Sequence, residues 1–316
     1  MQLKKLYSEI IKTGIENDPR NKSEVAVYLQ EQNKSFLESS DKEKNFFDKE
    51  KLTNPYSDTR ILNGNGNEEF SSLLVGIDVE TQDLLLADYI RKNSKKIDAV
   101  LTHHPEGKAF AELSDVMNIQ EDVLSKFGLP INVAQDLLST RITEVKRSIM
   151  PYNHERTISA AKHLEFPFLC AHTPADNCVY KYLKDLFEKE NPNNLNDIID
   201  LLLDIPEYAS SARHGVAPLI IVGDKKRKTG KILVDMTGGT SGPEDIYSAY
   251  QNAGIGTIIG MHMGEKHRKE AEKNHINVII AGHMASDSLG MNILLDSVLS
   301  DDVDIIEFSG FTRFKR

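Results

Sequence analysis

Short apolar runs alternate along most of this chain with segments in which apolar residues recur at helical spacing. In the first half the runs cover 72–79, 99–102, 130–134 and 166–171, and in the second half 218–222, 231–236, 257–260 and 277–281. Segments of helical spacing separate most of these runs, for example 81–92, 113–127, 154–164 and 265–274. Buried strands that alternate with helices are typical of an α/β fold. The pattern therefore predicts mixed, mostly parallel sheets flanked by helices.

The chain divides into three stretches by pattern. Residues 1–65 are charge-dense and helical in spacing, and we interpret them as a helical N-terminal extension that ends in turn-forming residues. Residues 66–185 and 186–316 then form a first and a second α/β lobe. Within the second lobe, the polar segment 223–230 lies between two apolar runs and predicts a β-hairpin.

Composition and charge narrow the class of protein. The 316 residues carry a formal net charge of −10, which leaves no surplus of Lys and Arg for a general nucleic-acid partner. No apolar run approaches the roughly 18 residues of a membrane helix, and the first residues lack the apolar core of a signal peptide. The two cysteines, Cys170 and Cys178, form no disulfide framework, and Cys170 lies in an apolar run. We expect a cytoplasmic protein without a membrane partner.

Metal-ligand residues follow three of the predicted strands. His103 and His104 precede Pro105, and the spacing His-x-x-x-Asp occurs twice, at His172 with Asp176 and at His283 with Asp287. Functional groups gather beyond the carboxyl ends of parallel strands, and residues four apart share one face of a helical turn. A single histidine at a strand end is more often a hydrogen-bonded structural residue. Three such clusters in equivalent positions predict one shared metal site.

The kind of ligand limits the kind of metal. Neutral imidazoles combined with carboxylates suit Zn, Mn, Fe or Co as divalent ions, and no thiolate is needed. Carboxylates can bridge a pair of ions, as in two-metal hydrolases.

Three further features have two interpretations each. The turn 238–242 (GGTSG) either cradles a phosphate, with Gly239 and Gly242 as the binding residues, or is a tight structural turn. His154 either serves the site or lies at a helix start that Asn153 caps. Asp78 either orients a ligand histidine or ends its strand.

The motifs and their order resemble the Nif-three-like dinuclear metal centre family, which includes the homologues named GTP cyclohydrolase 1 type 2. The resemblance covers about residues 70–300. It consists of an Asp-Val strand end, a His-His-Pro segment, a His-Thr-x-x-Asp segment, a Gly-rich turn and a final Gly-His segment. In this chain these are Asp78-Val79, His103-His104-Pro105, His172-Thr173-Pro174-Ala175-Asp176, Gly238-Gly239-Thr240-Ser241-Gly242 and Gly282-His283 followed by Asp287.

The resemblance implies a two-lobed fold with two divalent metal ions between the lobes and a homo-oligomer, commonly a hexamer. It implies five metal ligands, with His172 beside them: His103, His104, Asp176, His283 and Asp287. The chain departs from the family in two places. Asp287 stands where the family usually has Glu. The segment Gly260–Gly264, which contains His262 and precedes His267, stands where the family usually has a Gly-Asp pair followed by a histidine a few residues on. We interpret His267 as a surface residue and leave His262 open between the cleft and the surface.

Two functions fit these observations. The first is a metal-dependent hydrolase that acts on a small nucleotide-like or phosphorylated substrate. The alternative is a non-catalytic metal-binding interaction or metal-trafficking protein, because no obvious general acid adjoins the clusters in the sequence.

Overall fold

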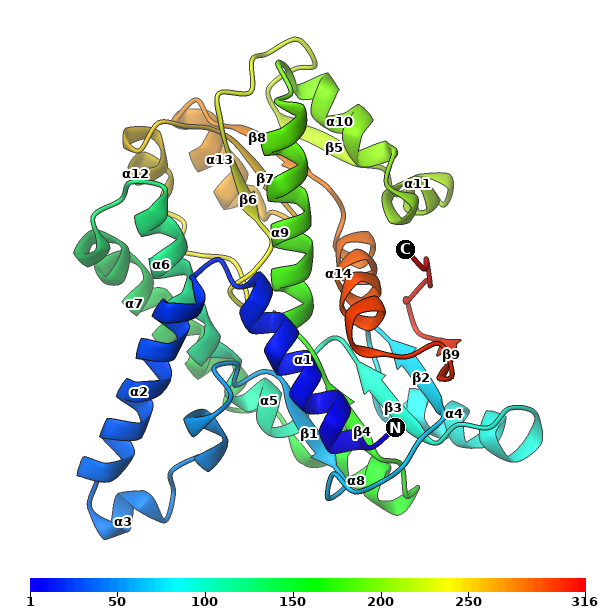
Figure 1. The fold of residues 1–316 in the computed structure, drawn as a ribbon. Coiled ribbons are helices and arrows are strands. Elements are labelled where there is room, and N and C mark those ends of the chain that lie inside the picture. The colour runs from blue at the N-terminus through cyan, green and yellow to red at the C-terminus, as the bar shows by residue number, and fades with distance from the viewer.

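Two sheets organise the computed structural model, which describes residues 1–316 (Figure 1). The first sheet has the order β1 (Arg60–Asn63), β4 (Phe168–Cys170), β3 (Ala99–Thr102), β2 (Ser72–Gly76) and β9 (Asp304–Glu307). The second has the order β5 (Leu219–Val222), β8 (Asn277–Ile280), β7 (Ile255–Gly260) and β6 (Lys231–Asp235). Only the pairs β1–β4 and β5–β8 are antiparallel. The predicted fold, two lobes with mixed and mostly parallel sheets, is confirmed.

Helices cover both sheets. Those between the strands of the first sheet are α4 (Thr81–Asn93), α5 (Gly107–Ala111), α6 (Ile119–Lys126), α7 (Ile131–Ile149) and α8 (Glu155–His163), with the 3-10 helix η2 (Leu113–Asn118). Those that follow are α9 (Thr173–Glu190), α10 (Leu195–Leu203), α11 (Pro206–Arg213), α12 (Tyr247–Asn252), α13 (Glu265–Lys273) and α14 (His283–Val298). No helix is both long enough and apolar enough to cross a membrane.

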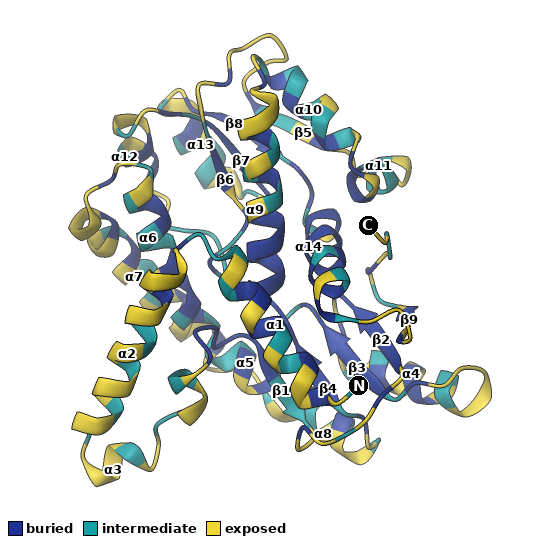
Figure 2. Ribbon diagram, in the orientation of Figure 1, coloured by how far each residue is buried: buried dark blue, intermediate teal, exposed yellow.

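Helix α9 runs through the middle of the molecule and is buried over much of its length (Figure 2). It leaves the first sheet at β4 and lies along α14, which follows β8 of the second sheet. The two helices approach closely at Gly290, where an added Cβ would overlap the carbonyl group of Ala175. The absence of a side chain at Gly290 therefore lets the two lobes dock tightly beside the ends of β4 and β8.

The N-terminal residues contribute to the body of the protein as well as projecting from it. Helix α1 (Leu3–Asn17) packs on α9 and buries Leu3, Leu6 and Ile10 in the core of the first sheet. Helices α2 (Lys22–Glu38) and α3 (Asp41–Lys44) project from the body and are largely exposed (Figures 1 and 2), and η1 (Lys49–Leu52) leads back toward β1. Near the other end of the chain, β9 pairs with β2 and so returns to the first sheet.

Two local predictions are wrong. Residues 130–134 form the start of α7, not a strand, because Pro130 precedes the helix and burial of Ala134 and Leu138 follows helical spacing. The predicted hairpin around 223–230 does not form, since β5 pairs with β8 while β6 pairs with β7. The two strands therefore lie at opposite edges of the second sheet.

Candidate metal centre

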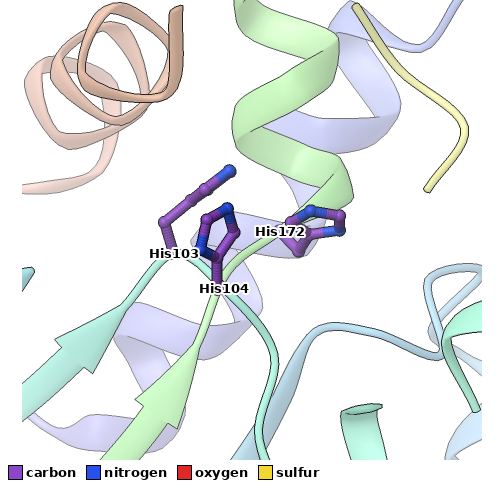
Figure 3. A group of neighbouring side chains, drawn as sticks. All are labelled: His103, His104 and His172. Atoms are coloured by element: carbon purple, nitrogen blue, oxygen red, sulfur yellow. The ribbon is translucent and has the colours of Figure 1, made fainter. Parts of the chain in front are cut away.

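The strand ends bring the histidines together. His103 and His104 follow β3 directly, and His172 lies between the end of β4 and the first residue of α9. Figure 3 shows these three imidazole rings gathered where the two strands end, with centroid separations of 4.9–6.0 Å. His283 begins α14 after the left-handed turn at Gly282 (φ 114°), and its ring lies 5.2 Å from that of His104.

Two buried carboxylates lie among these rings. The Asp287 carboxylate lies 3.6 Å from Nε2 of His103 and 3.5 Å from Nε2 of both His104 and His283. The Asp176 carboxylate lies 3.5 Å from Nε2 of His103 and 3.8 Å from Nε2 of His172. All six sequence-predicted residues therefore converge, and the shorter side chain of Asp287 still faces three imidazoles.

The other nitrogen of three rings is fixed by an acceptor. Nδ1 of His103 donates to the carbonyl oxygen of Ala171 (3.1 Å), Nδ1 of His104 to Asp78 (2.6 Å) and Nδ1 of His172 to Asp58 (2.8 Å). Since a carbonyl can only accept, the proton of neutral His103 lies on Nδ1 and its Nε2 carries a lone pair. Hydrogen bonds of this kind set the tautomer and orientation of metal-binding histidines.

The carboxylate oxygens between the rings have no donors. Oδ1 of Asp176 and both oxygens of Asp287 are buried without a hydrogen-bond partner. Buried polar atoms are nearly always paired, and an unpaired one costs free energy. Because Nε2 of His103, His104 and His283 lies 3.5–3.6 Å from these oxygens, a cation that replaces any proton between them would be held by both kinds of ligand. The residues present therefore fit a divalent metal ion.

Burial and mutual charge shift the protonation of the cluster in opposite directions. Burial raises the pKa of Asp176 to about 8 and lowers the pKa of His103 well below its usual range. Burial also acts to lower the pKa of His104, but the carboxylates of Asp287 and Asp78 outweigh it and raise that pKa to about 10. Opposed shifts in one buried group of side chains are typical of functional sites.

The cluster opens into a cavity of about 530 Å³. His104, His172 and His283 line it, together with His262, whose ring lies 5.1 Å from that of His283. His262, which the sequence left open, thus faces the cleft. His267 does not line this cavity, and it contacts the Tyr247 hydroxyl at 3.2 Å.

The Gly-rich turn is held by a side chain from the other lobe. The Gln120 amide donates to the carbonyl oxygens of Gly238 and Thr240, both at 2.6 Å. Gly239 lines the cavity at the cluster, whereas Gly242 lines a separate surface hollow. Helix α12 begins at Tyr247, so the turn does not lead directly into a helix start. This geometry favours the structural interpretation of the turn.

Sequence reasoning missed Asp58. Its side chain is fully buried and accepts hydrogen bonds from Nδ1 of His172 (2.8 Å) and from the Thr173 hydroxyl (2.6 Å). It therefore holds the ring of His172 and the first turn of α9, which carries Asp176. The only signal in the sequence was an aspartate in the turn-forming segment 54–58.

The fold and the cluster define a class, namely a two-lobed α/β protein whose His and Asp side chains meet between the lobes and could hold metal. A crystal structure of a NIF3 superfamily protein from Sphaerobacter thermophilus is similar at a TM-score of 0.70 and 26% identity. The match covers 81% of this chain and 92% of that one. This similarity confirms the resemblance to the Nif-three-like family that the motifs show.

More distant matches have lower similarity. Reduced HcgD from Methanocaldococcus jannaschii has a TM-score of 0.49 and 15% identity, over 79% of this chain and 87% of that one. A Bacillus cereus protein related to NIF3 has a TM-score of 0.42 and 11% identity, over 78% and 90%. No family model matches the chain, and neither does any curated protein.

Proposed function

We propose that this protein is a metal-dependent hydrolase for a small nucleotide-like or phosphorylated substrate. The observation that carries the proposal is the set of buried carboxylate oxygens without hydrogen-bond partners, which face imidazole Nε2 atoms beside an open cavity. Such an arrangement has a high energetic cost in a metal-free protein and is relieved by a bound cation.

The proposed ligands are the five residues predicted from sequence, with His172 as a sixth candidate on the same cluster: His103, His104, Asp176, His283 and Asp287. The set contains only nitrogen and oxygen donors, which suits Zn, Mn, Fe or Co and a pair of ions bridged by a carboxylate. Both cysteines are buried free thiols outside the set.

Divalent ions at such a site lower the pKa of water and polarise the bond under attack. The chain's own residues would orient the metal ligands and bind the substrate. Asp78 and Asp58 keep His104 and His172 in one orientation through their Nδ1 hydrogen bonds. His262 and Thr240 line the cavity beside the cluster, where they can bind and orient a substrate.

The test combines metal content with turnover. Protein stripped of metal and reloaded with Zn, Mn, Fe or Co is analysed for stoichiometry and assayed against nucleotides and phosphoesters. His104→Ala should lose metal and turnover together, whereas His163→Ala, an exposed histidine at the end of α8, should lose neither. Turnover by the metal-free protein would overturn the proposal. Stoichiometric metal without any turnover would favour the non-catalytic metal-binding alternative.

We also propose a homo-oligomer, with the hexamer implied by the family resemblance. Exposed apolar side chains on α4, among them Leu85, Leu86 and Tyr89, support self-association. Light scattering of the purified chain measures the oligomeric state, and a monomer at micromolar concentration would contradict this proposal.

A further inference from the structure

The wall of the cavity that α5 and residues 150–157 supply has a different chemistry from the cluster. Phe110 from α5 lies against Tyr152 (centroids 5.7 Å apart, 62°) and against His154 (5.5 Å, 61°). All three rings line the cavity. We call this group of three rings the aromatic corner.

The aromatic corner is incompletely buried. Tyr152 is 62% exposed although its ring contacts Phe110, and Nδ1 of His154 is buried without a hydrogen-bond partner. Exposed aromatic surface that lines a cavity is a common feature of ligand sites, because a planar ligand can stack there.

Two charged side chains that line the same cavity form no ion pair. Glu106 is half-buried and Arg156 is exposed, and neither forms an ion pair within the chain. Asp78 and Glu80 line the cavity as well, so its walls carry three carboxylates and one guanidinium. This balance disfavours an anionic group in this part of the cavity and favours a group that donates hydrogen bonds.

We propose that the aromatic corner and Glu106 select the substrate by a planar, N–H-bearing heteroaromatic ring. The ring stacks against Phe110 and Tyr152, and its amino or ring N–H group donates to Glu106. Any phosphate of the same substrate then lies toward the metal cluster, away from Glu80 and Glu106. This inference rests on the proposed function, since it assigns the part of the substrate remote from the metal ions.

Aromatic rings and a lone carboxylate together identify the ligand better than either alone. An aliphatic ligand would offer Glu106 no hydrogen-bond donor, and a phosphosugar without a ring would place its charge among like charges. A ring that both stacks and donates covers the exposed aromatic surface and gives Glu106, which has no ion pair, a further hydrogen-bond donor.

Calorimetry with nucleosides tests this proposal on both metal-stripped and metal-loaded protein. The probes are two pairs that differ by one amino group, adenosine with purine riboside and guanosine with inosine, and ribose serves as the ringless probe. We expect at least one aminated nucleoside to bind about tenfold more tightly than its partner, as for a hydrogen bond to a charged group. Ribose should bind weakly or not at all.

Two variants separate stacking from hydrogen bonding. Tyr152→Ala should weaken both members of the preferred pair equally, by about tenfold, as for the loss of one stacking ring. Glu106→Gln should reduce the discrimination within the pair to about threefold or less, since a neutral acceptor forms a weaker bond. The matched controls are Phe46→Ala after α3, where the phenylalanine is 84% exposed, and Glu307→Gln on β9, neither of which lines the cavity. Neither control should change binding.

The proposal is overturned if no nucleoside binds, if ribose binds as tightly as the nucleosides, or if both variants bind like the unmodified protein. Ring binding does not require the metal, so it is separable from the hydrolase proposal. Nucleoside binding without turnover would count against the hydrolase alone. Turnover of glycerol phosphate without nucleoside binding would contradict only the proposal that a heteroaromatic ring selects the substrate.

Discussion

Replacement of Asp58 by alanine should weaken the metal centre from outside it. The carboxylate is fully buried and accepts from His172 at 2.8 Å and from Thr173 at 2.6 Å, so Asp58→Ala strands two buried donors. Each stranded donor costs about 1–3 kcal/mol, which gives about 2–6 kcal/mol for the pair. Removal of a desolvated charge near Asp176 and Asp287 offsets part of this cost. We therefore expect a loss of unfolding free energy near the lower half of that range, about 2–4 kcal/mol.

The same substitution should lower metal affinity about 10- to 100-fold, because His172 loses the partner that fixes its Nδ1 proton and ring orientation. Denaturant unfolding in the presence of chelator measures the loss of unfolding free energy, and chelator competition with Zn or Co measures the loss of metal affinity. The control is Asp185→Ala on the same helix, α9. Asp185 is about half-exposed and pairs with Lys181, an interaction of little energetic weight.

A conservative variant separates the two effects. In Asp58→Asn the amide oxygen, placed where Oδ2 lies, can still accept from both His172 and the Thr173 hydroxyl. Stability should then return to within about 1 kcal/mol of the unmodified protein, while metal affinity stays reduced because a neutral amide polarises the imidazole less. Metal affinity in Asp58→Ala within about twofold of the unmodified protein would refute this reasoning.

Three further predictions concern the same centre. Gly290→Ala should destabilise the protein by about 1–3 kcal/mol and reduce metal binding, because the new Cβ overlaps the Ala175 carbonyl and separates α9 from α14. Gly264→Ala, where a Cβ meets nothing within 4 Å, is its control in unfolding and metal titrations, and equal behaviour of the two would contradict the packing argument. Metal at about 100 times its Kd should add about 2.7 kcal/mol of stability and chelator should remove it, a change of about 4 °C in Tm by calorimetry. An unchanged Tm would count against a bound ion. Finally, Asp176→Asn should abolish metal binding without destabilising the metal-free protein. Since burial raises the pKa of Asp176 from 3.8 to about 8, its folded form holds a proton that the unfolded chain releases, and the metal-free protein should lose stability as pH rises across that interval. Between pH 4 and pH 8, the unfolding free energy of Asp176→Asn should therefore rise relative to that of the unmodified protein. A difference that does not change with pH would argue against a raised pKa of Asp176.

The parts of the fold that sequence predicts are those that local pattern decides. Apolar runs fixed the positions of most strands, and the spacing of His172 with Asp176 and of His283 with Asp287 predicted first helical turns. Both pairs do lie where α9 and α14 begin. These features depend on residues a few positions apart, so short-range periodicity is sufficient to find them.

Contacts between residues far apart in the sequence explain the wrong hairpin prediction and the missed role of Asp58. The segment 223–230 has turn-forming residues and apolar flanks, yet β5 and β6 lie apart because β8 and β7 fill the positions between them. Asp58 and His172 are separated by 114 residues, and no local pattern connects them. Residues 130–134 are too few to distinguish alternation from one turn of a helix. One local signal was overlooked, since Asn194 and Asp197 form a capping box at the start of α10.

The same local motif, a His-x-x-x-Asp helix start after a parallel strand, occurs twice in the metal centre. Each lobe ends a parallel strand at a histidine and places an aspartate four residues later, on the first turn of a buried helix: α9 in one lobe and α14 in the other. The first lobe also supplies His103 and His104 after β3, whereas the second lobe supplies only His283 and Asp287. The two carboxylates share His103 only because α9 and α14 pack closely at Gly290. Because burial and the neighbouring Asp287 carboxylate raise the pKa of Asp176 to about 8, the Asp176 carboxyl group keeps its proton at neutral pH when no cation is present, and metal binding between the docked lobes would displace that proton.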